Sequence, residues 1–492
     1  MMHWFPLLFL IFTSTLLRGQ NIPVIDYEKA YELPDSSVTL DVDRYYSMIL
    51  ANHPVVKQAE LQTEKAEQAL RSARGHFDPK IEATWDTKEF KGTDYYNILN
   101  AGLKIPVWFP VDVKAGIDRN TGVFLNPESS IPDANANRQM FLGVSVPLGK
   151  GLFIDQRRAV VKQAIAYQSL AEAERQKMLN KIFYQAAKDY YSWYNSYYHL
   201  QFLVQSISIA NQIFERVKTD YDFGEAAVID TIQAQITLQN RQVEYAQARI
   251  DYVRTSLTLS NHLWTESGEP LELTEKMVPP RIDDIPQGID EQVYFQLLEM
   301  AANNHPEIRK LQAKIAGLQV QQQLNKENLK PQVDLSYSFL DEPFDSRGET
   351  SGFDFNDNYK LGLAFSFPIF LRKERGKIRE TDLKLRESNY EVQIANRSIV
   401  NDLNATYAEI NQLQNVISQI SGVVSNYQRM VEAELINLQN GESDLFKINF
   451  QQEKLIDAQL KYLKLRTYYE KVRAELYYVS GIPNLPQQLT SQ

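Results

Sequence analysis

Four segments of the chain alternate between apolar residues and polar or small residues. They follow Pro79 and Pro331 or end at Pro147 and Pro368. Their apolar positions are Ile81, Ala83, Trp85; Met140, Leu142, Val144, Val146; Val333, Leu335, Tyr337, Phe339; and Leu361, Leu363, Phe365, Phe367. A period of two with one apolar face predicts a half-buried strand, either in a soluble sandwich or in the wall of a lipid-facing barrel. Four strands cannot close a barrel, and open edges are not tolerated in lipid, so a membrane version requires further copies of the chain.

Two much longer stretches lack helix-breaking residues. No proline lies between Pro147 and Pro270, or between Pro368 and Pro483. Helices of ~65–70 residues in these stretches would be roughly 100 Å long at about 1.5 Å per residue. A Gly-Glu pair interrupts each stretch, near residues 224 and 441. Since glycine suits the left-handed turn that ends a helix, each stretch is predicted to form a long helical hairpin.

Apolar residues in these stretches follow the three-and-four spacing of a coiled coil. The stripes are Ile229, Ile232, Ile236, Gln239, Val243, Ala246, Ile250, Val253, Leu257; Ile410, Leu413, Ile417, Ile420, Val424, Tyr427, Val431; and Leu455, Ala458, Tyr462, Leu465, Tyr469, Val472, Leu476. A seam of this spacing buries apolar surface against a partner helix. The expected partner of each stripe is the other helix of the same hairpin.

The two halves of the chain repeat the same landmarks. Asn52-His53-Pro54 recurs as Asn304-His305-Pro306, and Pro79 recurs as Pro331, both at an offset of 252 (305 − 53 and 331 − 79). The repeats are predicted at residues 41–264 and 290–482, each with a helix, two strands and a hairpin. The proline-rich residues 265–289 form a linker, residues 341–357 a loop and residues 483–492 a tail. The first repeat is longer because of residues 91–137, which are predicted to form an extended loop or an added hairpin.

The amino terminus indicates an exported protein. An apolar run within residues 1–20 reads as a signal peptide, with a membrane anchor as the alternative, and residues 21–40 form an amino-terminal extension. The chain contains no cysteine, which excludes disulfides and thiolate chemistry. Its net charge of −10 gives no general reason to bind nucleic acid, so no nucleic-acid partner is expected.

The sequence carries no motif of a catalytic or cofactor-binding site. It has no P-loop, no dinucleotide fingerprint and no G-x-S-x-G. None of its six histidines has metal-ligand spacing. His53 and His305 precede proline at equivalent positions of the repeats, which favours a helix-boundary role. We therefore expect a protein that is not an enzyme and has no cofactor and no metal.

Together, these repeated landmarks resemble the TolC-type outer membrane efflux family. The resemblance covers roughly residues 40–482 and includes the basic residues after the second strand of each repeat, such as Arg157-Arg158 and Arg372-Lys373. It implies a mainly α protein with a β-barrel portion, in which long coiled-coil hairpins are fused to outer-membrane strands in two tandem repeats. It also implies a homotrimer with a 12-stranded barrel and a periplasmic helical tunnel. The implied role is passive export through the outer membrane, coupled to a periplasmic adaptor and an inner-membrane transporter.

The resemblance suggests where the functional surfaces lie. The turns would form the tunnel tip, which holds the gate or the adaptor contact, at Gly224, Glu225, Asp230, Gly441, Glu442 and Asp444. The lumen-facing strand residues would be Glu82, Asp86, Asp334 and Ser336, and the residues facing outer-membrane lipid would be Ile81, Trp85, Leu335, Tyr337 and Phe365. The second turn departs from the family pattern, with Leu438 three residues before the glycine. The gating contacts of the family are therefore not carried over.

Two other classes of protein share part of this pattern. A periplasmic adaptor also has a long hairpin, but such proteins typically have one hairpin beside a lipoyl-like domain. A structural coiled-coil protein of the envelope would explain the helices, but not the repeated fusion of strands to hairpins.

Overall fold

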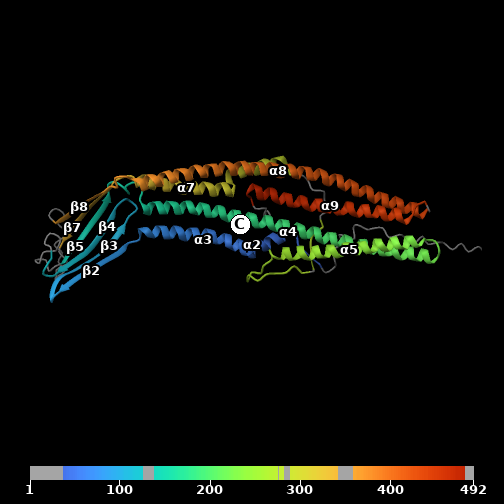
Figure 1. Ribbon diagram of the computed structural model, residues 1–492, viewed down its shortest axis with the longest axis horizontal. Helices are drawn as coiled ribbons and strands as arrows, with labels where there is room; N and C mark the ends of the chain where they lie inside the picture. The colour runs from blue at the N-terminus through green and yellow to red at the C-terminus, as the bar shows by residue number, and fades with distance from the viewer. Residues whose placement is uncertain are drawn as a thin grey trace, which may run out of the picture.

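The computed structural model describes residues 37–125, 138–274, 276–281, 289–341, 358–440 and 442–482. The predicted signal peptide 1–20, the tail 483–492 and Gly441 lie outside the described residues, as does nearly all of the predicted loop 341–357. The molecule is elongated, with a β-sheet at one end and two helical hairpins reaching the other (Figure 1).

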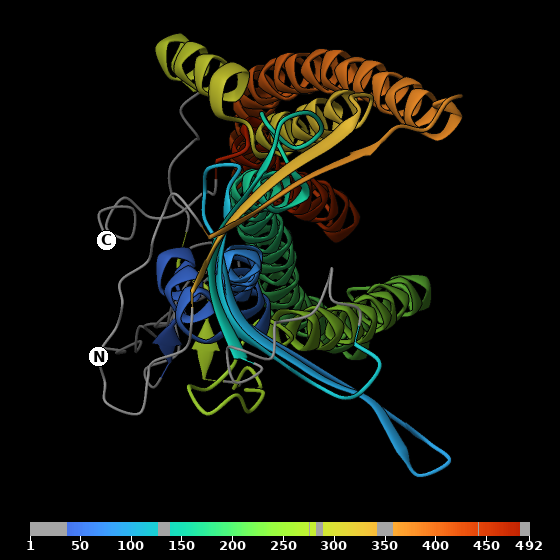
Figure 2. The same ribbon diagram turned by 90° about the vertical axis from the view of Figure 1, so that its left-hand side faces the viewer.

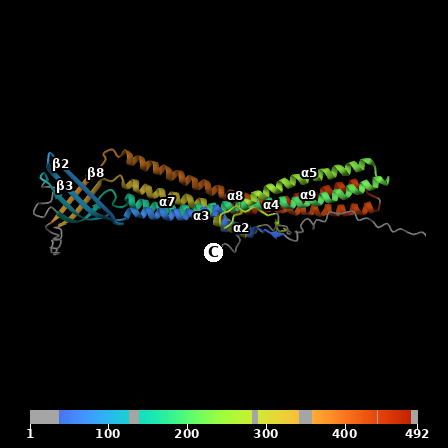
Figure 3. The same cartoon turned by 90° about the horizontal axis from the view of Figure 1, so that it is seen from below.

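The two hairpins account for most of the length. The first is α4 (Gln156–Asp222) followed by α5 (Val228–Ser260), and the second is α8 (Arg372–Gln439) followed by α9 (Leu445–Ser480). With 67 residues in α4 and 68 in α8, these two helices are each roughly 100 Å long, as predicted. Both turns lie at the end of the molecule farthest from the sheet (Figure 3).

Shorter helices precede the strands of each repeat. They are α2 (Val42–Asn52) and α3 (Pro54–Arg74) in the first, and α6 (Glu291–Asn304) and α7 (Pro306–Glu327) in the second. The imidazole Nδ1 of His53 accepts a hydrogen bond from the Val55 N–H at 3.1 Å. His305 accepts one from Glu307 in the same way, also at 3.1 Å. The predicted boundary role of both histidines is confirmed, because each caps the helix that begins at the following proline.

The helices lie side by side in a fixed order across the molecule. Next to the sheet the order is α3, α4, α7, α8, and toward the hairpin turns it is α5, α4, α9, α8. The long helices α4 and α8 belong to both halves. One lateral side of the chain is therefore formed by α3 and α5, and the other by α8.

The sheet contains two strands in addition to the four alternating segments of the sequence. Its strands are β2 (Lys80–Phe90), β3 (Thr93–Pro106), β4 (Asp112–Thr121), β5 (Arg138–Pro147), β7 (Gln332–Asp341) and β8 (Tyr359–Ser366), and they are hydrogen-bonded in that order. All neighbours are antiparallel. Figure 2 shows the sheet curving across the end of the helices, with β2 at one margin.

Two alternatives were predicted for residues 91–137, an extended loop and an added hairpin, and the structure shows the hairpin. Most of the segment forms β3–β4, so the chain contributes six strands in place of the four on which the expected twelve-stranded barrel was based. The alternation does continue there, through Leu99, Ala101 and Leu103, but the glycines and prolines around it resemble loop composition. The fold class itself, long helical hairpins fused to a curved sheet in two repeats, is confirmed.

Two of the three predicted seams are packed as expected. Ile410, Ile417 and Val431 of α8 are buried, as are Leu455, Tyr469 and Leu476 of α9. The α5 stripe was assigned to the wrong partner. Ile229, Ile236, Val243 and Leu257 are at least half exposed, and α5 instead packs on α4 through smaller side chains such as Ala234 and Ala248. The stripe faces away from its own hairpin.

Near mid-length, the two ends of the first repeat meet. The strand β1 (Val38–Thr39) pairs in parallel with β6 (Met277–Val278). Beside them lies a buried aromatic cluster that includes Tyr45, Tyr190 and Trp193. The phenol of Tyr190 donates to the Leu40 carbonyl at 2.8 Å. Leu40 at the end of the amino-terminal extension and Val278 in the predicted linker thus take part in the core.

The His53 cap predicts a sensitivity to acid. Burial, with the neighbouring His262, lowers the pKa of His53 from 6.5 to about 4, so its stabilising contribution is present above pH 6.5 and is lost as the pH falls through 4. His53→Asn keeps a capping side chain without a titrating group. The unfolding midpoint of the purified protein, measured from pH 7 to 4, should fall less in this variant than in wild type. Equal slopes would contradict the assignment, and His53→Ala should lose ~1 kcal/mol at neutral pH.

Candidate functional site

The register of the sheet separates two faces. Ile81 lies opposite Leu103, which in turn lies opposite Ala115, and this correspondence continues through β5 and β7 to β8. Residues directly opposite one another share a face. The positions predicted to face lipid, Ile81, Trp85, Leu335, Tyr337 and Phe365, therefore all lie on one face. Those predicted to face the lumen, Glu82, Asp86, Asp334 and Ser336, all lie on the other.

The apolar face is openly exposed. Ile81 is 85% exposed, Trp85 67% and Phe365 69%. The indole N–H of Trp85 donates to Asn97 Oδ1 on the next strand at 2.8 Å, so its one polar group is paired within the sheet. An apolar surface of this extent is normally covered by lipid or by another protein.

The polar face is built from small residues where strands approach closely. A Cβ atom on Gly143 would lie 2.4 Å from Ser338 Oγ, and one on Gly362 would lie 2.6 Å from Ser336 Oγ. At Gly116 it would lie 2.6 Å from the Phe141 ring and 2.5 Å from the Ala101 carbonyl. These glycines let neighbouring side chains lie flat, which leaves room on this face.

Aromatic and cationic side chains gather where the strands join the helices. Phe109, Phe153 and Phe370 are each more than 70% exposed in the connecting segments. The Lys330 ammonium lies 4.2 Å from the Phe153 ring centre, and the Arg372 guanidinium lies 5.2 Å from that of Phe370. Such a girdle is typical of the level at which a membrane barrel meets the headgroups.

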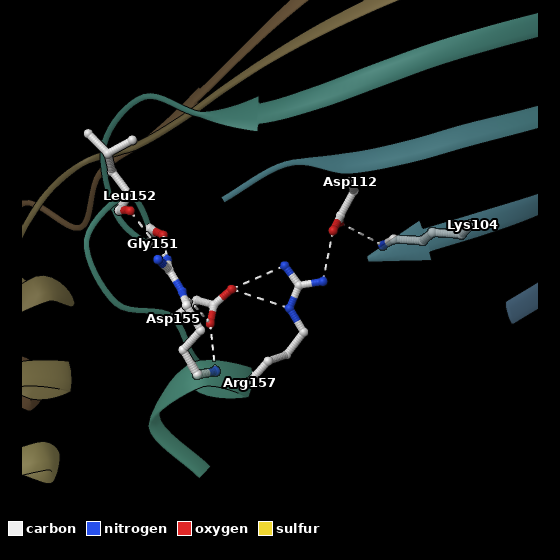
Figure 4. A network of polar contacts seen from close by, with 7 residues as sticks. Lys104, Asp112, Gly151, Leu152, Asp155 and Arg157 are labelled. Carbon is white, nitrogen blue, oxygen red and sulfur yellow. Dashed lines mark hydrogen bonds and ion pairs between the residues drawn. The ribbon is translucent and has the colours of Figure 1, made fainter. Parts of the chain in front are cut away.

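An ion-pair network fixes this junction (Figure 4). Asp155 caps α4 by accepting from the Arg158 N–H at 2.9 Å and also accepts from Arg157. Arg157 in turn donates to Asp112 at the start of β4, at 2.7 Å. Burial alone would raise the pKa of Asp155, but these hydrogen bonds outweigh it and hold the pKa below its ordinary value. The first turn of α4 is thus tied to the β3–β4 hairpin.

The predicted tip residues lie together at the far end of the molecule, except Gly441, which is outside the described residues. Gly224 has φ +81°, and its N–H bonds to the Tyr221 carbonyl at 2.9 Å. The Glu225 N–H bonds to the Asp220 carbonyl at 2.8 Å, and the Glu442 N–H repeats this bond to Asn437 at 2.8 Å. These bonds define a Schellman turn at the first tip and the same six-residue closure at the second.

Asp230 and Asp444 form hydrogen bonds with the backbone at these tips. The Asp230 carboxylate accepts from the Ala227 N–H at 3.0 Å, and that of Asp444 accepts from the Lys447 N–H at 2.9 Å. Each satisfies backbone donors at the start of a returning helix. Glu225 and Glu442 are exposed, as Asp230 and Asp444 also are.

Two further observations limit the chemistry of the described residues. Among them there is no group of three or more His, Cys, Asp or Glu side chains placed to hold a metal ion. No helix in the described part of the chain is long and apolar enough to cross a membrane.

Comparison with known proteins identifies the class. The chain matches the outer membrane efflux protein family over residues 45–263 and 297–481. No curated protein sequence matches it. Both repeats are included in the family match, which spans most of the chain. This protein belongs to the outer membrane efflux protein family.

Solved structures share the fold at low sequence identity. The CmeC outer membrane channel of Campylobacter jejuni is 13% identical, with 96% of each chain covered and a TM-score of 0.61. VceC of Vibrio cholerae is 15% identical, with 89% of this chain and 96% of that one covered and a TM-score of 0.63. The MtrE channel of Neisseria gonorrhoeae is 14% identical, with 90% and 89% covered and a TM-score of 0.60.

Family membership confirms the predicted function as an outer-membrane efflux channel subunit, located in the outer membrane and extending into the periplasm. It excludes the two alternatives, an adaptor and a structural coiled coil. The family is one of transport proteins and not of enzymes.

The two sheet faces can be tested with neighbouring positions on β7. Leu335→Lys places a charge on the apolar face, where lipid contact costs ~2–4 kcal/mol near the bilayer centre. Ser336→Lys extends the same charge from the polar face, which tolerates it. We expect outer-membrane fractions to lose the first variant and retain the second. The reverse pattern would show that the faces are assigned the wrong way round.

Proposed function

We propose that three copies of this chain form a passive conduit, with the polar sheet face lining the lumen and the apolar face in contact with outer-membrane lipid. The supporting observation is that the described elements leave uncovered surfaces on both lateral sides of the chain. On one side are the free edge of β2 and the apolar stripe of α5. On the other are the free edge of β8 and an apolar row along α8.

The two helical surfaces match in length and spacing. Along α5, Ile236, Val243 and Ile250 recur every seven residues and are 51%, 69% and 54% exposed. Along α8, Val416, Val423 and Met430 also recur every seven residues and are 39%, 40% and 46% exposed. Heptad rows of this kind pack against one another between helices. A neighbouring copy can therefore cover α5 with its α8, and the ring closes when the rotation between copies is one third of a turn.

The interface on α5 is tested by one pair of substitutions. Val243→Asp buries a charge between copies and should dissociate the oligomer, since an unpaired buried charge costs several kcal/mol or shifts its protonation. The matched control is Gln242→Asp, at an exposed position on the flank of the stripe. The heat-sensitive oligomer on gels should be lost in the first variant only. An intact oligomer with Val243→Asp would refute this interface.

The hairpin tips are the proposed contact with a periplasmic adaptor coupled to an inner-membrane transporter. They combine exposed charges, Glu225 and Glu442, with exposed apolar side chains. Phe223 is 77% exposed, Ile229 70% and Phe446 60%. This mixture of an apolar patch with a charged rim is typical of a protein interface.

Reversing the tip charges should separate assembly from export. In Glu225→Lys combined with Glu442→Lys, the oligomer should remain intact because neither side chain lies between copies in the proposed ring. Export by cells carrying the complete system should fall, since charge complementarity with the adaptor is lost. Glu266→Lys, exposed and far from the tips, is the control. Unchanged export in the double variant, measured as accumulation of a fluorescent efflux substrate, would contradict the contact.

A further inference from the structure

The β3–β4 hairpin is built as a continuous part of the sheet and not as an appendage. β3 pairs with β2 from Lys80–Lys104 to Phe90–Thr93 and with β4 from Asn97–Thr121 to Pro106–Asp112. β4 then pairs with β5 over eight residue pairs, Asp112–Ser145 to Arg119–Arg138. The β2–β3 and β3–β4 ladders cover the ~9–11 residues that a tilted strand needs to cross a bilayer, and the β4–β5 ladder is slightly shorter.

Both faces of the sheet continue through the hairpin. The apolar face passes along Leu99, Ala101 and Leu103 in β3, and along Val113, Ala115 and Ile117 in β4. The polar face carries Asn100, Gly102 and Lys104 opposite Asp118, Gly116 and Lys114. A hairpin folded over a membrane surface would not need this alternation, whereas a piece of barrel wall does.

Side-chain packing fits the hairpin to β5. The Phe141 ring extends from β5 across the polar face, and a Cβ on Gly116 would lie 2.6 Å from it and one on Gly102 3.4 Å. Glycine on both inserted strands is therefore what allows the ring to lie flat. The turn is also secured, since Asp112 pairs with Arg157 at 2.7 Å and with Lys104 at 3.3 Å (Figure 4). The Trp108 ring centre lies 5.3 Å from that of Phe77.

Inserting two strands keeps the edge strands of the sheet antiparallel to each other, so neighbouring copies can still pair edge to edge. With six antiparallel strands, β2 and β8 run in opposite directions, so β8 of one copy lies antiparallel to β2 of the next. An insertion of one or three strands would break this match. Both edge strands also alternate in the same sense, with Ile81 and Trp85 on β2 and Leu363 and Phe365 on β8 on the apolar face.

We propose that β8 and β2 of adjacent copies pair to close an eighteen-stranded barrel, three copies of six strands. This inference rests on the proposed trimer and adds a statement about its outer segment. With strands ~4.8 Å apart and tilted by ~40°, twelve strands give a backbone diameter of ~24 Å and eighteen give ~35 Å. Lumen side chains that take up ~10 Å leave ~14 Å and ~25 Å respectively. The hairpin adds strands to the barrel but adds no helix to the tunnel. The barrel lumen is therefore wider than that of a twelve-stranded barrel on the same helices.

The chain has no cysteine, so introduced thiols are the only ones present. Closure is tested by paired cysteines on facing edges, scanning Ile81, Ala83 and Trp85 of β2 against Leu361, Leu363 and Phe365 of β8. Covalent dimers and trimers in outer-membrane fractions are expected for the pairs in register. If no pair links chains, the proposed trimer fails, and with it this inference.

Width is tested separately with Ser338→Cys on the polar face of β7. Intact cells are treated with maleimide-linked polymers of increasing size. A polymer ~20 Å across should label this thiol in the otherwise complete chain, because it passes a lumen of ~25 Å but not one of ~14 Å. Deletion of residues 93–121 removes β3 and β4 and leaves residues 122–137 to connect β2 with β5. This deletion should reduce labelling by the large polymer about tenfold or more, while small maleimides still react.

The outcomes distinguish the two claims. Cross-linked trimers that exclude the ~20 Å polymer in the complete chain overturn the eighteen-stranded barrel and leave the trimeric channel standing. Equal labelling in the complete chain and the deletion variant also overturns it, since the hairpin then contributes nothing to the width. If the deletion variant does not assemble, the absolute size limit of the complete chain decides.

Discussion

The pairing of backbone groups along strand edges is the constraint on which this structure depends. Among the described strands of a single chain, β2 and β8 each have a strand on one side only, so one row of their N–H and C=O groups has no strand beside it. In lipid every such group costs several kcal/mol unless it is paired. The apolar stripes of α5 and α8 lie on the same two sides as these edges. The chain is thus one segment of a closed wall, and its strands and helices require completion at the same places.

Side chains that cap the ends of helices stabilise this architecture. His53 and His305 cap α3 and α7, Asp155 caps α4, and Asp230 and Asp444 hold the first turns of the returning helices. The conspicuous acidic residues at the tips divide into two kinds. Asp230 and Asp444 accept backbone hydrogen bonds at the start of the returning helices, whereas the exposed side chains of Glu225 and Glu442 belong to the proposed contact. A carboxylate near a turn is therefore no evidence of a gate until its backbone partners are known.

Much of the fold could be predicted from the sequence, and the failures have physical causes. The repeated His-Pro and Gly-Glu landmarks placed the helix boundaries, because capping and turn geometry depend on a few neighbouring residues. The hairpin β3–β4 was predicted only as one of two alternatives, beside an extended loop, because its short alternating runs lie among glycines and prolines. These same glycines proved necessary for close packing under Phe141. The stripe on α5 was recognised but given the wrong partner, since heptad spacing shows that a surface must be covered and not what covers it.

The sequence by itself determined the periods: two along the strands, three and four along the helices, and 252 residues between the repeats. The first two periods follow from the geometry of a single strand or helix, and the third follows from duplication. None of them depends on which elements pack together. Only the tertiary structure decided that Ala234 and not Val243 faces α4, that six strands form one sheet, and that both free edges coincide with the exposed stripes. These depend on which surfaces meet at long range. Two apolar surfaces with the same spacing are interchangeable in a sequence and are distinguished only when the chain is folded.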